Sequence, residues 1–279
     1  MIAVSAIDPL LKALVSPPPR LTIDAHGVAV VTAHPDDEAI GCGAQLARLR
    51  GITAVTLTDG APRDLADARA RGYTSAPDYA VVRGAELRRA LAIAQVLPRN
   101  VFVLGFADQE AAFNMPAAAL ALCEIFCTRE IALVLTHAVE GAHPDHDAAA
   151  FVARAAAALA ARVGHPVSIV EMPYYRAGRF GLVRQTFVPG GQRQVQISLA
   201  RREREYKLAM FGAHASQAAR LAHFSTVTER FRAAAPFDFR MLPNGGRLLY
   251  QRYVRNMTGA QWLKLVEESC RQLGLDPVL

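Results

Sequence analysis

The 279-residue sequence is poor in cysteine and lysine and has no long apolar run. None of its four cysteines shows the paired spacing of a structural metal site. Cys123 and Cys127 lie on an expected apolar helix, which favours buried thiols over a disulfide. No stretch approaches the roughly 18 uninterrupted apolar residues of a transmembrane helix, and the N-terminus has no basic start typical of an export signal. We therefore expect a protein with no membrane span, located in the reducing cytoplasm.

Because lysine is scarce, the formal net charge of +6 comes almost entirely from arginine. The lysines are Lys12, Lys207 and Lys264. Basic residues are scattered among acidic ones, and the densest run, 201–205, mixes both signs as a solvated helix face does. This pattern argues against nucleic acid as a partner and leaves only a weak general attraction for anionic substrates.

Most of the chain alternates between apolar strands and helices. The expected strands are 28–33, 52–58, 100–104, 131–136 and 166–171. The helices between them are expected at 39–50, 79–97, 116–129 and 145–162. Such alternation predicts an α/β fold, a Rossmann-like open, mostly parallel sheet with helices on both faces.

The pattern changes in three places. The segment 59–78 lacks an apolar period, and its position beside the expected site suggests a mobile lid or substrate loop. Segments 182–188 and 194–199 flank Pro189-Gly190-Gly191, which predicts a β-hairpin. Helices are then expected at 201–212 and 258–273.

The segment His34-Pro35-Asp36-Asp37-Glu38 closes an apolar run that predicts a buried strand. Its imidazole and carboxylates therefore belong at the carboxyl end of a strand, where open α/β sheets place their ligand sites. Glu38 begins a helix, where the dipole favours an acid, so a structural role competes with a catalytic one. The glycines that follow, Gly41 and Gly43, suit close packing but do not form the dinucleotide-binding fingerprint.

A second cluster, His143-Pro144-Asp145-His146, also falls just past an expected strand end. Pro144 suits the first helical position, so both histidines lie near a helix start and can face one pocket. Imidazole and carboxylate donors from neighbouring strand ends can surround one divalent metal, as in zinc sites with three protein ligands. Such a metal lowers the pKa of water to about 7, and a carboxylate outside its shell can take the proton. The residues alone leave open whether Asp36 or Asp37 is the ligand.

Together these clusters resemble the LmbE-like / PIG-L family of zinc-dependent de-N-acetylases. The family includes enzymes that act on N-acetylglucosaminyl-phosphatidylinositol and on the sugar precursors of mycothiol and bacillithiol. The resemblance spans roughly residues 27–218. Its supporting pieces are Leu57-Thr58-Asp59-Gly60, Arg83-x-x-Glu86-Leu87, Leu104-Gly105-Phe106-x-Asp108, and Lys207 with Ser216-Gln217.

The resemblance implies a role for each residue of the clusters. It implies that His34, Asp37 and His146 bind one Zn²⁺ or another divalent metal. It makes Asp36 the general base, and His143 the group that polarises the amide carbonyl or stabilises the oxyanion.

Three further residues follow from the same resemblance. Arg83 and Asp108 match positions near the sugar, while a helix-start ion pair and a turn carboxylate are the ordinary alternatives for them. Asp145 would orient a ligand histidine.

By this resemblance the chain has an extension and linker (1–24), an LmbE/PIG-L-like catalytic domain (25–222) and a C-terminal extension packed on it (223–279). The aromatic residues of the tail favour packing over a sugar platform: Phe237, Phe239, Tyr250, Tyr253 and Trp262.

The implied activity is metal-dependent hydrolysis of the N-acetyl amide of an N-acetylglucosamine-type sugar or conjugate, releasing acetate and a free amine. An amidase acting on a larger sugar, thiol or lipid conjugate is an alternative, motivated by the 59–78 segment and the tail. A catalytically silent, metal-containing sugar-binding protein is another, and it is disfavoured because base, ligands and oxyanion histidine are all present. The partner expected in each case is a small N-acetylated molecule, and the resemblance also allows a homo-oligomer.

Overall fold

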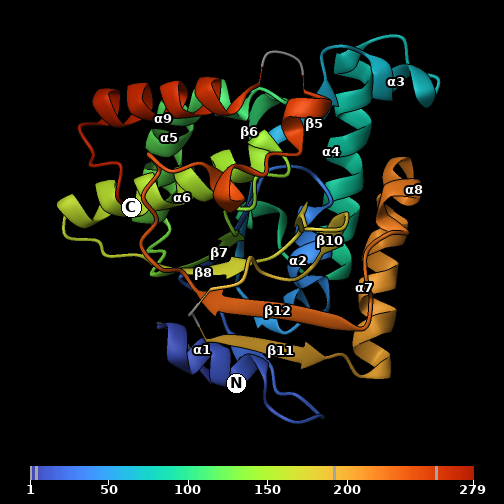
Figure 1. Ribbon diagram of the computed structural model, residues 1–279. Helices are drawn as coiled ribbons and strands as arrows, with labels where there is room; N and C mark the ends of the chain where they lie inside the picture. Colours follow the sequence, from blue (N-terminus) through green and yellow to red (C-terminus); the bar gives the residue numbers. More distant parts are fainter. Residues whose placement is uncertain (1, 4–5, 191–192, 255–256) are drawn as a thin grey trace.

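The computed structural model describes residues 2–3, 6–190, 193–254 and 257–279. At its centre is a seven-stranded sheet in the order β11-β12-β8-β7-β3-β5-β6 (Figure 1). Its strands are β3 (Val28–Thr32), β5 (Thr53–Pro62), β6 (Val101–Asp108), β7 (Leu133–His137), β8 (Ser168–Met172), β11 (Gln194–Ser198) and β12 (Thr228–Ala233). Strands β3, β5, β6, β7 and β8 pair in parallel, whereas β12 and β11 are antiparallel additions at one edge. The predicted α/β fold with a mostly parallel sheet is confirmed.

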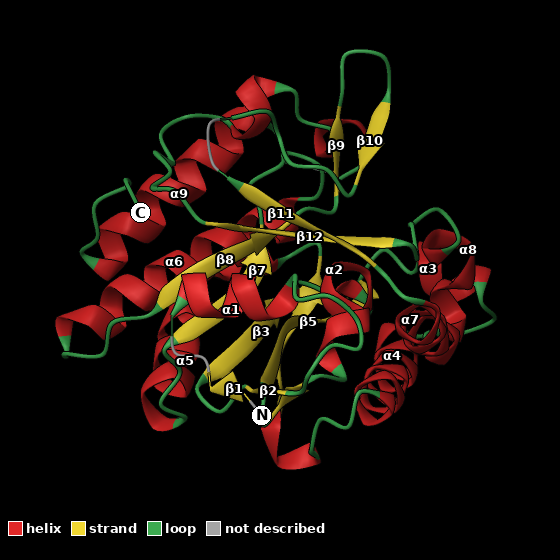
Figure 2. Cartoon of the chain, turned by 90° about the horizontal axis from the view of Figure 1, so that it is seen from below, coloured by secondary structure: helices red, strands yellow, loops and turns green. Residues whose placement is uncertain are grey.

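Helices cover both faces of this sheet (Figure 2). The helices of the described chain are α1 (Ile7–Leu14), α2 (Asp37–Leu46), α3 (Ala66–Ala70), α4 (Ala76–Ile93), α5 (Met115–Thr128), α6 (Pro144–Arg162), α7 (Arg201–Ala213), α8 (Ala218–Leu221) and α9 (Gly259–Leu273). Successive residues of β3 point to opposite faces. Val28 and Val30 join the core shared with α1, α2, α4 and α7, while Ala29 and Val31 join the core shared with α5, α6 and α9. Burial on both faces explains why β3 is a continuous apolar run.

The strand order reverses between β3 and β7. From β3 the chain builds β5 and β6 on one side, and it then returns to place β7 and β8 on the other. A crevice forms outside the carboxyl ends of strands at such a reversal, because the following loops diverge to opposite sides. Both histidine clusters leave the sheet at this point.

The expected hairpin of 182–188 with 194–199 is wrong. Strand β10 (Leu182–Arg184) pairs with β9 (Tyr175–Ala177), and the resulting hairpin projects from the body (Figure 2). Strand β11 pairs instead with β12, more than thirty residues further along the chain, with Ile197 opposite Glu229. The Pro189-Gly190-Gly191 signal thus marks a connection between two sheets, and Gly191 lies outside the described residues.

The segment 59–78 is more ordered than its composition indicated. Strand β5 continues to Pro62, α3 follows, and Ser75 caps α4 by accepting a hydrogen bond from the Asp78 N–H. Ala61, Ala68 and Tyr79 form a small buried core beneath it. The missing apolar period reflects this small separate core.

Both ends of the chain pack onto the domain. Helix α1 buries Leu10 and Leu14, and strands β1 (Ile2–Ala3), β2 (Ile23–Asp24) and β4 (Leu49–Arg50) form a small parallel sheet. In the tail, Phe239, Tyr250 and Trp262 are fully buried, as the packing interpretation predicts. Tyr253 departs from it, with 53% of the residue exposed.

One segment, Ala111–Thr128, is long and apolar enough by length and composition to cross a membrane. It comprises the short 3₁₀ helix η2 (Ala111–Asn114) and α5. Its residues Ala118, Leu122 and Phe126 are fully buried in the core shared with α6 and α9.

Candidate metal centre and active site

The two predicted clusters meet at the carboxyl ends of β3 and β7. His34 follows β3, and His143 is the N-cap of α6, with His146 in the first turn of that helix. The ring centroid of His34 lies 4.6 Å from that of His143 and 5.2 Å from that of His146. One nitrogen from each of these three histidines lies within 4.8 Å of the other two. Residues more than a hundred positions apart therefore form one buried group.

Asp37 lies between the predicted ligand histidines. Its Oδ2 is 3.3 Å from His34 Nδ1, and its Oδ1 is 3.4 Å from His146 Nε2. Burial alone would raise the pKa of Asp37, but the neighbouring His146 and His137 hold that pKa well below its usual value. Asp37 is thus a carboxylate in contact with both histidines predicted to share a metal with it.

These donors fit a divalent cation. They combine imidazole nitrogen with carboxylate oxygen, which is the donor set of zinc sites. The His146 nitrogen that faces Asp37 is Nε2, 3.4 Å from Oδ1, and His34 Nδ1 lies 3.3 Å from Oδ2, so two imidazole nitrogens flank the same carboxylate. The assignment of His34, Asp37 and His146 as the ligands stays a prediction.

His137, the last residue of β7, joins this group although the sequence analysis did not single it out. Its Nε2 accepts a hydrogen bond from the Ala33 N–H at 3.0 Å and lies 3.4 Å from Asp37 Oδ2. Burial and the nearby His146 lower the pKa of His137 to about 4. A neutral ring whose Nε2 accepts carries its proton on Nδ1, so His137 holds the backbone at Ala33, the residue before His34. Its position one residue past the predicted strand was the available signal.

Asp36 has a strained backbone, with φ of 123°. Non-glycine residues rarely adopt such angles, and strain of this kind is concentrated at functional sites. The Asp36 N–H donates to Glu38 Oε2 at 2.9 Å, and Asp36 Oδ2 lies 3.3 Å from Arg83 Nη2. Burial raises the pKa of Asp36, and Arg83 partly opposes that shift. The surroundings therefore fix this carboxylate beside the cluster of His34, Asp37 and His146.

Arg83 is buried in the interior of α4, so the helix-start ion pair considered for it is wrong. It donates to the Pro35 carbonyl and contacts Asp36. Gly60 makes room for it, because a Cβ there would lie 2.8 Å from Arg83 Nε and from Pro35 Cδ. Arg83 therefore positions Asp36 and the turn before it.

Asp108 and Asp145 lie on the other side of His34. Asp108 Oδ1 is 3.3 Å and Asp145 Oδ2 is 3.2 Å from His34 Nε2. Asp145 also accepts the backbone N–H groups of Gln109 and Ala111, at 2.6 and 3.1 Å. Burial would lower the pKa of His34, but Asp108 and the other carboxylates raise it well above its usual value. The orienting role predicted for Asp145 agrees with this contact.

His143 faces the cavity with a defined tautomer. Its Nδ1 accepts the Asp145 N–H at 3.2 Å, so a neutral ring carries its proton on Nε2. Burial, with His34 and His146 nearby, holds the pKa of His143 well below its usual value. Nε2 lies 4.0 Å from Asp108 Oδ1. His143 is therefore a neutral N–H donor at the edge of the site.

Glu38 plays a supporting part. Its Oε1 lies 2.7 Å from Nε2 of His214, a buried residue that no sequence pattern had marked. Burial would lower the pKa of His214, but the Glu38 carboxylate raises it. Because Glu38 also accepts the Asp36 N–H, it links α7 to the strained turn. This geometry agrees with the structural interpretation of Glu38.

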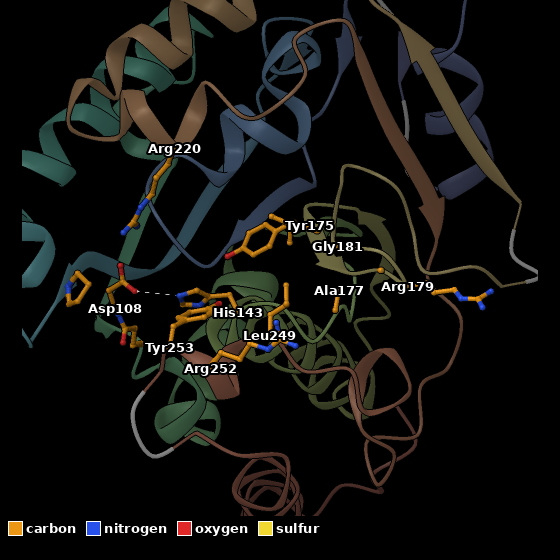
Figure 3. A pocket seen from close by; sticks show the side chains of 14 residues that line it. Asp108, His143, Tyr175, Ala177, Arg179, Gly181, Arg220, Leu249, Arg252 and Tyr253 are labelled. Carbon is orange, nitrogen blue, oxygen red and sulfur yellow. Dashed lines mark ion pairs between the residues drawn. The ribbon is translucent and has the colours of Figure 1, made fainter.

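A cavity of about 620 Å³ adjoins the cluster (Figure 3). Asp108, His143 and Tyr175 line its inner part. The β9–β10 hairpin, with Leu249, Arg252 and Tyr253, lines its outer part, where Figure 3 shows Arg220 and Arg252 on the wall and Arg179 pointing away. The cavity thus leaves room beside the histidine–aspartate cluster for a ligand much larger than a single ion.

Comparison with known proteins gives one family and one fold. Residues 29–157 match the family model described as GlcNAc-PI de-N-acetylase, PIG-L. No curated protein matches the chain by sequence. The A40926 pseudoaglycone deacetylase Dbv21 superposes with a TM-score of 0.56 at 19% identity, over 76% of this chain and 100% of that one.

Two further solved structures share this fold. The zinc-inhibited form of teicoplanin deacetylase Orf2 gives a TM-score of 0.54 at 18% identity, over 74% of this chain and 97% of that one. The N,N'-diacetylchitobiose deacetylase from Pyrococcus horikoshii gives 0.54 at 18% identity, over 89% and 92%.

Proposed function

Residues 29–157 form a PIG-L (LmbE-like) family domain, and on that premise we propose that the protein hydrolyses the N-acetyl amide of an amino sugar or its conjugate. The products are acetate and a free amine, and the proposed cofactor is one divalent cation, with Zn²⁺ the first candidate. The observation that carries the proposal is the meeting of a strained carboxylate, a histidine–aspartate cluster and a neutral N–H donor in one small pocket, which shares Asp108, His143 and Tyr175 with the larger cavity.

His34, Asp37 and His146 are the residues that would hold the cation. When bound, such a cation acts as a Lewis acid that polarises the amide carbonyl and lowers the pKa of water to about 7. Asp145 then has a positioning role, because it contacts His34 and accepts a backbone N–H, and His137 fixes the Ala33 N–H that precedes His34.

Asp36 is the proposed general base. Arg83 and the Glu38 contact to its N–H fix its carboxylate, which takes a proton from the attacking water as the new C–O bond forms. The same carboxylate then delivers that proton to the amide nitrogen as the C–N bond breaks. The water oxygen leaves in acetate, and the nitrogen leaves as the amine.

His143 is proposed to stabilise the charge that develops on the carbonyl oxygen. Its Nδ1 is occupied by the Asp145 N–H, which directs the Nε2 proton toward the cavity. A preformed donor of this kind is worth roughly 10²–10³-fold in turnover.

The cavity favours the alternative in which the sugar is part of a larger conjugate. Its volume of about 620 Å³ lies within the roughly 300–1,000 Å³ of sites that enclose drug-sized ligands. The superposed proteins include deacetylases of the A40926 pseudoaglycone and of N,N'-diacetylchitobiose, and the second of these substrates is larger than one acetylated sugar.

The test is release of acetate and amine from a graded amide panel. The panel runs from methyl N-acetylglucosaminide through N,N'-diacetylchitobiose to N-acetylglucosaminides with larger neutral, anionic and lipid groups. Metal-stripped protein and protein reconstituted with Zn²⁺, Fe²⁺ or Co²⁺ are compared. Release of acetate and amine in equal amounts, and only when metal is added, supports the proposal. Tight binding of the sugars without amine release in any metallated form would favour the silent sugar-binding protein.

A further inference from the structure

Residues Leu248–Tyr253 of the C-terminal extension, here called the 248–253 segment, contact the loop that carries His143. This segment lies outside residues 29–157, so the family domain itself does not supply it. Its role rests on the function proposed above for His143.

Two hydrogen bonds join the segment to the loop. The Leu249 N–H donates to the Gly141 carbonyl at 2.7 Å. The Tyr253 hydroxyl donates to the Ala142 carbonyl. That carbonyl belongs to the peptide unit that ends at the His143 nitrogen, so the bond fixes the peptide plane from which His143 starts.

The loop is held from the opposite side by α6. Asp147 accepts the N–H groups of Glu140 and Gly141 at 2.8 and 3.1 Å. Gly141 has φ of +69°, and a Cβ on it would lie 3.0 Å from Leu248 Cδ2. The loop therefore passes between α6 and the 248–253 segment with no space for a side chain at Gly141.

Tyr253 also reaches the cavity. Its ring centroid lies 6.2 Å from that of His143, and both residues line the same wall in Figure 3. The residue is 53% exposed, so hydrophobic burial does not account for its place. Its hydroxyl contacts the Ala142 carbonyl and also lies beside the Tyr175 side chain.

We propose that Tyr253 is a positioning residue for His143. Its hydroxyl holds the Ala142–His143 peptide so that the His143 Nε2 proton points into the cavity. The C-terminal extension thus helps to set the geometry of the active site.

The test compares Tyr253→Phe with Tyr250→Phe. The first change removes the hydroxyl and keeps the ring. Tyr250 lies three residues away, fully buried, and its hydroxyl has no hydrogen-bond partner within the described chain, which makes it the matched control. A neutral hydrogen bond is worth about a 2- to 10-fold change. We therefore expect kcat of Tyr253→Phe to fall by that factor with KM within about twofold, while Tyr250→Phe keeps the wild-type kcat.

Amide hydrogen exchange of the metal-free protein gives a readout that is independent of activity. Peptides covering 140–144 and 248–250 should exchange faster in Tyr253→Phe than in the wild type or Tyr250→Phe. Wild-type kcat and wild-type exchange in Tyr253→Phe would overturn the inference. So would a lower Tm with unchanged kcat, because that result assigns Tyr253 to stability alone.

The two proposals can fail separately. If the wild-type protein with bound metal releases no acetate from any amide, the proposed function fails. Exchange in the 140–144 peptide then still decides whether Tyr253 holds the loop.

Discussion

At the scale of single residues, the site depends on a few side chains whose surroundings give each one a task. Asp36 and Asp37 are adjacent in sequence, yet Asp37 contacts His34 and His146 whereas Asp36 contacts Arg83. The strained φ of Asp36 separates the two carboxylates. Sequence reasoning from the residues alone could not tell them apart, because the difference arises from a turn angle and a distant arginine.

Replacing the proposed base tests this separation. Asp36→Asn keeps the shape and removes the proton acceptor, so turnover should fall by about 10²–10⁴-fold. Metal per chain, measured by elemental analysis, should stay at the wild-type value because Asp36 is not a proposed ligand. Asp64→Asn, which changes a surface carboxylate that accepts the Ala66 N–H, is the control. Near-normal turnover in Asp36→Asn would remove Asp36 from the mechanism.

Gly60 tests the packing around Arg83. Gly60→Ala should destabilise the fold for two reasons: the backbone φ of +68° disfavours alanine, and the new Cβ would lie only 2.8 Å from Arg83 Nε. Gly72→Ala has a φ of +81° and nothing within 4 Å, so it isolates the backbone term of about 1–2 kcal/mol. We expect denaturant unfolding to show a further loss of about 1–3 kcal/mol for Gly60→Ala, with reduced turnover. Equal losses in the two variants would mean that the contact with Arg83 does not constrain the site.

At the scale of elements, a buried ion pair joins three of them behind the site. Lys207 on α7 donates to Glu229 on β12 at 2.8 Å and to the Ile40 carbonyl of α2 at 2.7 Å. Glu229 also accepts the Ala44 N–H of α2. Helix α2 begins at Asp37, so this pair fixes the helix that follows the first cluster.

Lys207→Met should lower the free energy of unfolding by about 3–5 kcal/mol, because it leaves Glu229 buried without its partner. Adding Glu229→Gln removes the charge and keeps an acceptor for Ala44, so the double variant should be more stable than Lys207→Met. A double variant that is no more stable would show that the uncompensated charge is not the cause.

The same variant has a predicted pH dependence. Burial raises the folded-state pKa of Glu229, and loss of Lys207 should raise it further. A carboxyl with a raised folded pKa stabilises the fold below its unfolded pKa of about 4.3 and loses that contribution as pH rises through the folded value. The loss in free energy of unfolding caused by Lys207→Met should therefore be smaller at pH 5 than at pH 8. A defect that is independent of pH would contradict this assignment.

At the scale of the whole molecule, the strand ends that carry the site could be predicted and the later pairings could not. Strands β3 and β7 are buried on both faces, so each is a continuous apolar run followed by its polar cluster. Strands β9 and β10 are three residues each, too short to show a period. The partner of β11 lies beyond α7, and no local pattern encodes such a distant pairing. The contacts of His137, His214 and Tyr253 were missed for the same reason.

The account depends on one cation shared by His34, Asp37 and His146, and anomalous X-ray diffraction tests it most directly. Crystals grown with Zn²⁺ and measured at the zinc edge should show one strong peak bonded to these three side chains at roughly 2.0–2.2 Å, with one face open to the cavity. A crystal grown with saturating Zn²⁺ that shows no peak there, or shows the ion bound by other residues, would contradict the account.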